Sequence, residues 1–137
     1  MTALEDITQQ SAGTLAEALG IEITGVDGRN VLGRMPVDKR TVQIHGVLHG
    51  GASVAFAETL ASIGANLLVD YPRKYCVGVE INANHVTSVK SGWVEGIASP
   101  LKIGARIQVW DIRITGSRHE LVCVSRLTLA VIDKKDR

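Results

Sequence analysis

Residues 45–69, HGVLHGGASVAFAETLASIGANLLV, contain the segment that decides the fold. After the double glycine at 50–51, the stretch is almost unbroken in Ala, Leu, Val and Ile, and it is too long for one strand. Its apolar residues occur all round a helical circumference, which predicts a buried helix over about 51–69. Small residues dominate this helix and would let a wrapping sheet pack close to its axis: Ala52, Ser53, Ala55, Ala57, Ala61, Ser62, Gly64 and Ala65.

The segment before this helix predicts a short helix, a hairpin and a loop. Helical spacing of apolar residues over about 8–19 ends at a glycine, which is a typical stop signal. The alternation at 21–23, the turn residues at 27–30 and the following run VLGRMPV predict two strands. Positions 38–51 are rich in His, Gly and Gln, and we expect them to form a loop.

The second half of the chain has the pattern of β structure. Apolar runs separated by turn residues predict successive antiparallel strands: CVGVEIN, HVTSV, WVEGIASP, ARIQVWDIRIT and LVCVSRLTLAVI. The alternation changes phase at Val109–Trp110, which predicts a bulge in that strand. With 137 residues, 45% of them hydrophobic, the chain can build one core, so we expect a single α+β domain over 1–137.

Composition excludes several classes of protein. The net charge of +1 leaves no basic excess for nucleic acid or membrane binding, and aromatic residues make up only 4% of the chain. Cys76 and Cys123 lie far apart in apolar runs, which predicts buried free thiols rather than a disulfide. The polar N-terminus predicts no signal peptide, and Glu58 and Asn66 make the helix a poor membrane span. We expect a soluble cytoplasmic protein.

Glu58 is the one carboxylate inside the predicted buried helix. It lies about two turns after the double glycine, too far inside for capping, which acts within the first turn. One interpretation is a structural ion pair with an Arg or Lys of the sheet, because a buried carboxylate is costly unless it is paired. The other is a chemical role, and both interpretations stay open at this point.

The residues around Glu58 favour acyl-transfer chemistry. Gly50 stands where a helix start offers free N–H groups and a positive dipole end to developing negative charge. Gln43 and His49, with His45 between them, could hydrogen-bond a carbonyl or a water, and Ser62 lies one turn beyond Glu58. A carboxylate, an oxyanion donor and positioning groups are the parts that this chemistry needs.

Rival site patterns are weak. His45 and His49 have HxxxH spacing but no obvious third ligand, so we expect no metal. The chain has no GxSxG elbow of an α/β-hydrolase, and HGGAS lacks the GK[ST] ending of a phosphate-binding loop.

Two stretches, QIHGVLHGGASVAFAETLAS at 43–62 and VGVEINANHV at 77–86, closely resemble the hotdog-fold acyl-CoA thioesterases. The similarity is to the branch of the 1,4-dihydroxy-2-naphthoyl-CoA hydrolase and the enterobactin proofreading thioesterase, related to the phenylacetate-pathway and Arthrobacter-type 4-hydroxybenzoyl-CoA thioesterases. The resemblance implies a curved antiparallel sheet wrapped around one long central helix. It also implies a dimer with a continuous sheet, paired into a homotetramer, with active sites at the subunit interface.

The resemblance assigns a role to each residue of the motif. Glu58 matches the catalytic carboxylate, which attacks the thioester or activates a water, and Gly50 matches the glycine whose N–H polarises the carbonyl. Gln43 and His49 match the polar pair near that carbonyl and the lytic water, and Ser62 matches a residue that assists the water or holds the acyl group. In the family, Glu58 would face the other three groups across the interface.

The path of the substrate and CoA is matched less completely. The resemblance places His85 near the pantetheine or nucleotide path, and Val79, Ile81 and Ser88 are further candidates for binding the substrate. Relatives often carry a basic residue near position 87, where this chain has a threonine. Three basic residues are candidates for contacting the CoA phosphates instead, although each could equally be a solvated surface charge: Lys90, Lys102 and Arg106.

The function that the resemblance implies is hydrolysis of an acyl-CoA thioester to free acid and CoA, without a cofactor. The acyl group would be aromatic, similar to hydroxybenzoyl or dihydroxynaphthoyl, or of medium chain length. One alternative is a non-catalytic hotdog domain that binds acyl-CoA, which would not need Glu58 or Gln43. Another is a hotdog dehydratase, which would need an aspartate to pair with His49.

Overall fold

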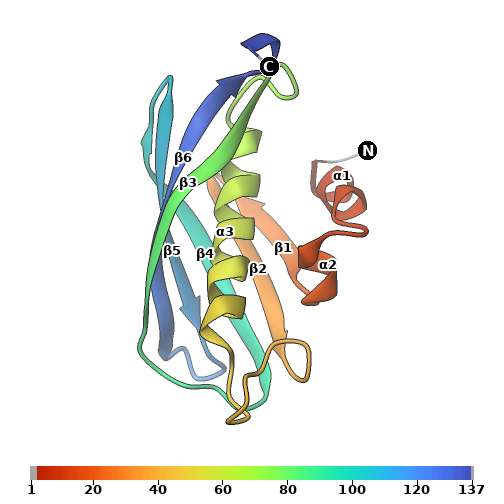
Figure 1. The fold of residues 1–137 in the computed structure, drawn as a ribbon, viewed down its shortest axis with the longest axis vertical. Coiled ribbons are helices and arrows are strands. Elements are labelled where there is room, and N and C mark those ends of the chain that lie inside the picture. The colour runs from red at the N-terminus through yellow and green to blue at the C-terminus, as the bar shows by residue number, and fades with distance from the viewer. Residues whose placement is uncertain (1–2, 137) are drawn as a thin grey trace.

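The computed structural model describes residues 3–136 as one curved antiparallel sheet wrapped around a long helix (Figure 1). Its helices are α1 (Ala3–Gln10), α2 (Leu15–Ala18) and α3 (Gly50–Leu67), followed at the end by a 3-10 turn, Lys134–Asp136. The six strands are β1 (Glu22–Asp27), β2 (Asn30–Val37), β3 (Lys74–His85), β4 (Gly92–Ile103), β5 (Ile107–Thr115) and β6 (Leu121–Asp133). The predicted α+β architecture, a sheet around one central helix, is confirmed.

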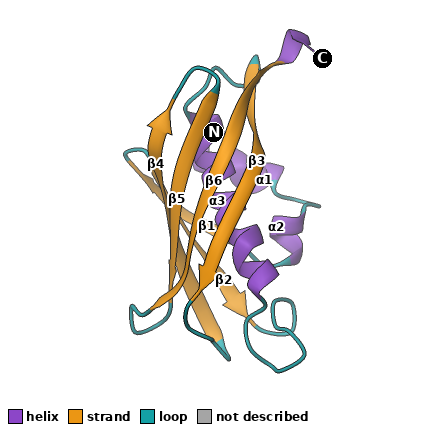
Figure 2. Cartoon of the chain, turned by 60° about the vertical axis from the view of Figure 1, so that its left-hand side comes forward, coloured by secondary structure: helices purple, strands orange, loops and turns teal. Residues whose placement is uncertain are grey.

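The order of strands across the sheet is β1-β2-β4-β5-β6-β3, with every neighbouring pair antiparallel. β3 is therefore an edge strand although it lies in the middle of the sequence. Figure 2 shows β3, β4, β5 and β6 in front and the helices behind them, so one face of the sheet is turned toward α3. The register of β3 on β6 shifts between Gly78 and Glu80, which leaves Val79 as a bulge and 63% exposed.

The central helix lies close to the sheet because both surfaces carry small residues. A side chain at Gly64 would overlap the ring of Trp110 on β5. A Cβ at Gly96 of β4 would lie 2.7 Å from Leu60 Cδ1 and 2.9 Å from the Phe56 ring. The helix and the sheet therefore pack into one core, in which Phe56, Leu60 and Trp110 are fully buried. The helix begins one residue earlier than predicted and ends two residues earlier.

The N-terminal segment differs from the single helix predicted over 8–19. The structure has two short helices, α1 and α2, separated by residues 11–14. The break follows from Gly13, whose φ of +76° is left-handed and cannot continue a right-handed helix. α1 contacts β1 and α2 contacts α3, so the segment lies across the open side of the central helix (Figure 1).

The bulge predicted at Val109–Trp110 lies instead on the partner strand. β5 keeps a regular alternation, and the register of β4 on β5 shifts between Pro100 and Lys102, opposite those two residues. The phase change in the sequence arises because Gln108 is polar and yet points inward. Its side chain is fully buried, and its Oε1 accepts a hydrogen bond from Trp110 Nε1 at 2.8 Å.

The expectation that HVTSV forms a strand holds only for its first residue, because β3 ends at His85.

Cys76 and Cys123 are free and buried, as predicted, and burial raises the pKa of both thiols. Of the helices within residues 3–136, none is long and apolar enough to cross a membrane.

Candidate active site

A hydrogen-bonded loop, residues 38–49, leads into the start of α3. The Arg40 side chain donates to Asp38 at 2.7 Å, and this pairing, with the Arg40 backbone N–H, lowers the pKa of Asp38 to about 2. The Thr41 hydroxyl donates to Pro36 O at 2.7 Å, while Thr41 O accepts from His49 N–H at 2.8 Å. The loop is therefore tied at both ends, and it holds His49 at the helix entrance.

The start of α3 presents one unused backbone donor. His49 is the N-cap: its Nδ1 accepts from Gly51 N–H at 2.7 Å, and its carbonyl oxygen accepts from Ala52 and Ser53. Within residues 3–136, Gly50 N–H has no acceptor, so it is free to bind an oxyanion at the positive end of the helix. Because Nδ1 accepts, the neutral His49 ring carries its hydrogen on Nε2 and offers a second donor.

Two further polar side chains lie at this entrance. The Oε1 atom of Gln43 accepts from His45 N–H, which leaves the Gln43 amide NH₂ as a donor. The His85 ring, at the end of β3, lies beside the helix start: its Nε2 would be 2.9 Å from a Cβ on Gly50. The structure thus brings four predicted site residues together at one end of the molecule: Gln43, His49, Gly50 and His85.

Ser88 follows in the loop after β3, next to the segment that enters α3. Leu48 N–H donates to Val89 O at 2.7 Å, which joins the two loops. Ser88 is exposed on this side of the fold. The loop after β3 therefore belongs to the same end of the molecule as the helix entrance.

Glu58 lies eight residues along α3 and is partly buried. Its carboxylate lies against Gly78 of β3, where any side chain would collide with it. Within residues 3–136, no Lys, Arg or His forms an ion pair with Glu58. The structural ion pair that the sequence left open is therefore not present in the described chain, and the carboxylate is available for chemistry.

Glu58 also lines a cavity of about 840 Å³ over the face of α3 that points away from the sheet. This volume is in the range of small-molecule sites. Ser62 lines it one turn further along, so the two residues share the cavity as predicted. Its apolar lining comes mainly from α3. Its opposite wall comes from α1 and the residue that follows it, through residues that the sequence did not single out: Asp6, Ile7, Gln10 and Ser11.

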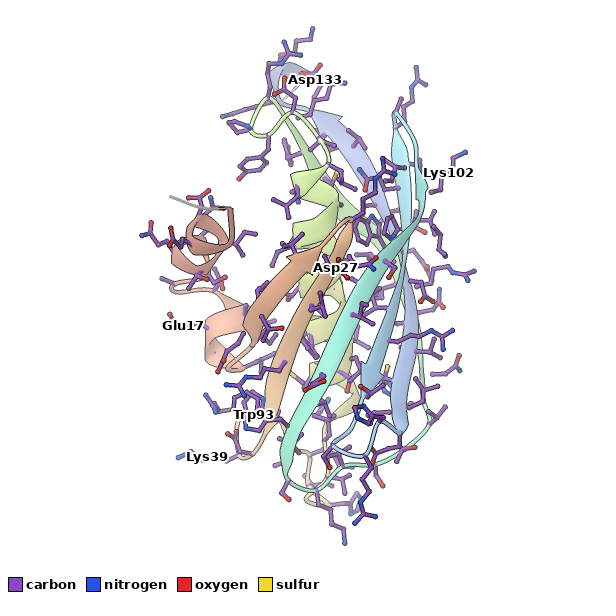
Figure 3. All side chains as sticks on the ribbon, turned by 180° about the vertical axis from the view of Figure 1, so that it is seen from behind. Glu17, Asp27, Lys39, Trp93, Lys102 and Asp133 are labelled. Carbon is purple, nitrogen blue, oxygen red and sulfur yellow. The ribbon has the colours of Figure 1, made fainter. Side chains whose placement is uncertain are left out.

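The candidate CoA contacts are not gathered at one place. Lys102 and Arg106 lie in and beside the turn between β4 and β5, at the end of the sheet far from Trp93 (Figure 3). α3 begins at the other end (Figure 1), so in one subunit these cations are remote from Gly50. Ile81 packs against the core, whereas Val79 is exposed on the edge strand.

Metal ligands are not clustered. Among the described side chains, no group of three or more His, Cys, Asp and Glu could hold a metal ion.

Comparisons with known proteins identify the family of this chain. Residues 45–123 match the family described as "Thioesterase superfamily". The chain is 42% identical over 129 residues to the 1,4-dihydroxy-2-naphthoyl-CoA hydrolase of Escherichia coli, covering 94% of each chain. It is 44% identical over 129 residues to the proofreading thioesterase EntH of Cronobacter turicensis, covering 94% of this chain and 93% of the relative. A crystal structure of a thioesterase from Haemophilus influenzae superposes with a TM-score of 0.93 at 45% identity, covering 97% and 92%.

Proposed function

Because this chain belongs to the thioesterase superfamily and is a thioester hydrolase, we propose that it acts on acyl-CoA with an aromatic or medium-chain acyl group. The observation that carries the proposal is the unpaired Glu58 carboxylate in a cavity large enough for a bicyclic ring. The names of two relatives, a naphthoyl-CoA hydrolase and a proofreading thioesterase, support an aromatic acyl group. A non-catalytic binding domain would have no use for that carboxylate.

The proposed site is shared between two subunits. Gly50 and Glu58 are eight residues apart on one straight helix, which separates them by about 12 Å along its axis. One carbonyl cannot contact both groups at that distance. The uncovered edge of β3 supports a two-fold dimer, because pairing two such edges would continue the sheet and bring two copies of α3 alongside each other. We propose that such dimers pair into a homotetramer.

In the proposed reaction the thioester carbonyl oxygen is held by the Gly50 N–H and the Gln43 amide of the partner subunit. Glu58 either attacks the carbonyl carbon directly or takes a proton from an attacking water. Both routes form an oxyanion at the helix start, where backbone donors and the dipole stabilise it. The C–S bond then breaks and CoA leaves as a thiolate, which takes a proton from Glu58 on the water route or from solvent on the direct route. The direct route also leaves the acyl group on Glu58 as an anhydride, which water hydrolyses to the free acid and the regenerated carboxylate. Water is the only other reactant, so we propose that no cofactor takes part.

We further propose a cytoplasmic location, which the free cysteines support because cytoplasmic thiols are kept reduced.

A panel of acyl-CoAs tests the proposed substrate class. Purified enzyme is given benzoyl-, hydroxybenzoyl-, naphthoyl- and straight-chain acyl-CoAs, and released CoA thiol is followed with a chromogenic disulfide. The two protein thiols are buried, with pKa values raised by burial, so they add little background. We expect the highest kcat/KM with aromatic or medium-chain substrates. Thiol release from none of the panel would overturn the proposal.

Mixing two inactive variants tests the shared site. When Glu58→Ala and Gln43→Ala proteins exchange subunits at random, about half of the dimers are mixed, and one of the two sites in each mixed dimer is intact. We therefore expect activity to rise to about a quarter of the wild-type value. Exchange is monitored by native mass spectrometry. If exchange is complete and activity stays absent, each site lies within one chain.

A further inference from the structure

The cavity beside Glu58 ends against the N-terminal helix α1. Glu58 lies on the β3 side of α3, whereas α1 packs beside β1, and Figure 1 shows these on opposite sides of the central helix. The cavity therefore crosses the outer face of α3 from the carboxylate to α1. An acyl group whose carbonyl is at Glu58 would extend across this face, and its far end would meet α1.

Part of the α3 wall of the cavity is apolar. Val54, Ile63 and Leu67 of α3 line it together with Ala55. Such a lining accepts a ring or a short chain through burial of apolar surface but cannot distinguish substituents by hydrogen bonding.

Most of the polar side chains along the cavity that carry a donor hydrogen already donate their hydrogen bonds to protein carbonyl groups. Four such donors are satisfied internally: Ser11 Oγ to Ile7 O at 3.0 Å, Thr14 Oγ1 to Ser11 O at 2.6 Å, Thr59 Oγ1 to Ala55 O at 2.7 Å, and Asn66 Nδ2 to Ser62 O at 2.8 Å. The three hydroxyl groups in this list can therefore still accept hydrogen bonds from a ligand but have no hydrogen left to donate.

On the α1 wall, too, a polar side chain already donates a hydrogen bond within the protein, and this wall also carries the negative charge of Asp6. Gln10 Nε2 donates to Asp6 Oδ2 at 2.9 Å, one helical turn away, and both side chains line the cavity. The pair keeps the second carboxylate oxygen of Asp6 and the amide oxygen of Gln10 as acceptors, against one remaining amide hydrogen. Acceptors outnumber donors on this wall, so it favours a ligand group that supplies a hydrogen, and a carboxylate there would be repelled by Asp6.

We propose that Asp6 and Gln10 determine specificity by accepting a hydrogen bond from a hydroxyl group at the end of the acyl group remote from the thioester. The proposal rests on the proposed function, since it assigns the cavity to the acyl group. Hydrogen bonds to an ionised acceptor are the stronger kind, so Asp6 contributes more than Gln10. The short helix α1 is then a selective wall of the substrate site and not only an appendage to the sheet.

Matched substrates test the proposal in the active enzyme. We compare acyl-CoA pairs that differ by one hydroxyl group at the distal ring position, hydroxynaphthoyl- against naphthoyl-CoA and 4-hydroxybenzoyl- against benzoyl-CoA. The ratio of kcat/KM within the better pair is expected to favour the hydroxylated member by about tenfold or more. Asp6→Leu and Gln10→Leu should bring that ratio toward one. Gln9→Leu, on the same helix but not lining the cavity, should keep the wild-type ratio.

A binding measurement separates this proposal from the thioesterase reaction. 2-Naphthol and 2-methylnaphthalene have similar shapes but only the first has a hydroxyl hydrogen, and their fluorescence reports binding to the intact protein. We expect wild type to bind 2-naphthol about tenfold more tightly than 2-methylnaphthalene. The Asp6→Leu and Gln10→Leu variants should bind the two probes with equal affinity. Equal binding by wild type, or a preference kept in both variants, overturns the proposal. So does the absence of binding, because a second subunit would then fill the cavity.

The two proposals fail in different ways. If no acyl-CoA is hydrolysed but the naphthol preference depends on Asp6, the proposed reaction is wrong and the selective wall stands. If acyl-CoAs are hydrolysed without regard to the distal hydroxyl, the reaction stands and the role of α1 is wrong.

Discussion

The Glu58→Gln enzyme hydrolyses its best acyl-CoA with a kcat about 10²–10⁴-fold below that of wild type, because glutamine can neither attack the carbonyl nor accept a proton from water. The substitution keeps the size of the side chain, so the fit against Gly78 is preserved. It also leaves no cation unpaired, because Glu58 has no ion-pair partner among residues 3–136. The melting temperature is therefore expected to stay near the wild-type value.

Thiol release and thermal unfolding, measured on the same preparation, check both halves of this expectation. Glu95→Gln is the matched control, because Glu95 is an exposed carboxylate on β4, away from the cavity. It should change neither quantity. A Glu58→Gln protein that melts several degrees lower and yet turns over within a few-fold of wild type would show that the carboxylate is structural.

The Gly50→Ala enzyme should lose about 10²–10³-fold in kcat, the usual cost of removing one oxyanion donor. Gly50 N–H has no acceptor within residues 3–136, and we expect a methyl group on this residue to crowd a carbonyl bound there and push it away from the N–H. The new Cβ would also lie 2.9 Å from His85 Nε2, so the ring must move. Since the donor acts on the oxyanion, we expect kcat to fall far more than KM rises.

Two variants separate the causes. Gly50→Ala combined with His85→Ala removes the collision with the ring. If the double variant still has a kcat far below that of His85→Ala alone, the blocked N–H is the cause. Gly25→Ala is the control for a glycine-to-alanine change, because a Cβ there meets nothing within 4 Å. An increase in KM alone for Gly50→Ala would contradict the oxyanion role of the helix start.

The central helix and its odd carboxylate could be predicted from the sequence because both depend on residues close together in the chain. This run of apolar and small residues is too long for one strand, which favours a helix, and Glu58 stands out within it. Gln108 shows the limit of this reasoning. A polar residue in an alternating run is expected to point outward, yet Trp110 supplies a buried donor that satisfies it. Pattern alone cannot foresee such a partner.

The site was predictable on one side only. Gln43, His49, Gly50 and Glu58 lie in one continuous stretch, so the motif contains them all. The opposite wall comes from Asp6 and Gln10, which reach the cavity only because α1 packs beside β1. Their spacing is that of any exposed helical face. The break at Gly13 that places α1 there could have been suspected from the glycine, although the helical period runs across it.

The bare edge of β3 also affects how the protein is made, apart from how it works. Within residues 3–136, no strand pairs with the outer edge of β3, although the Cys76 backbone there bonds to the Asn66 side chain. An exposed strand edge can pair with any other extended chain, so a newly synthesised subunit is open to aggregation until, in the proposed dimer, a second copy covers the strand. The bulge at Val79 interrupts the flat edge and reduces this hazard without removing it. Solubility and correct pairing are therefore one property of this chain. A substitution that weakens pairing along β3 should show itself first as inclusion bodies during expression, and only afterwards as lost turnover.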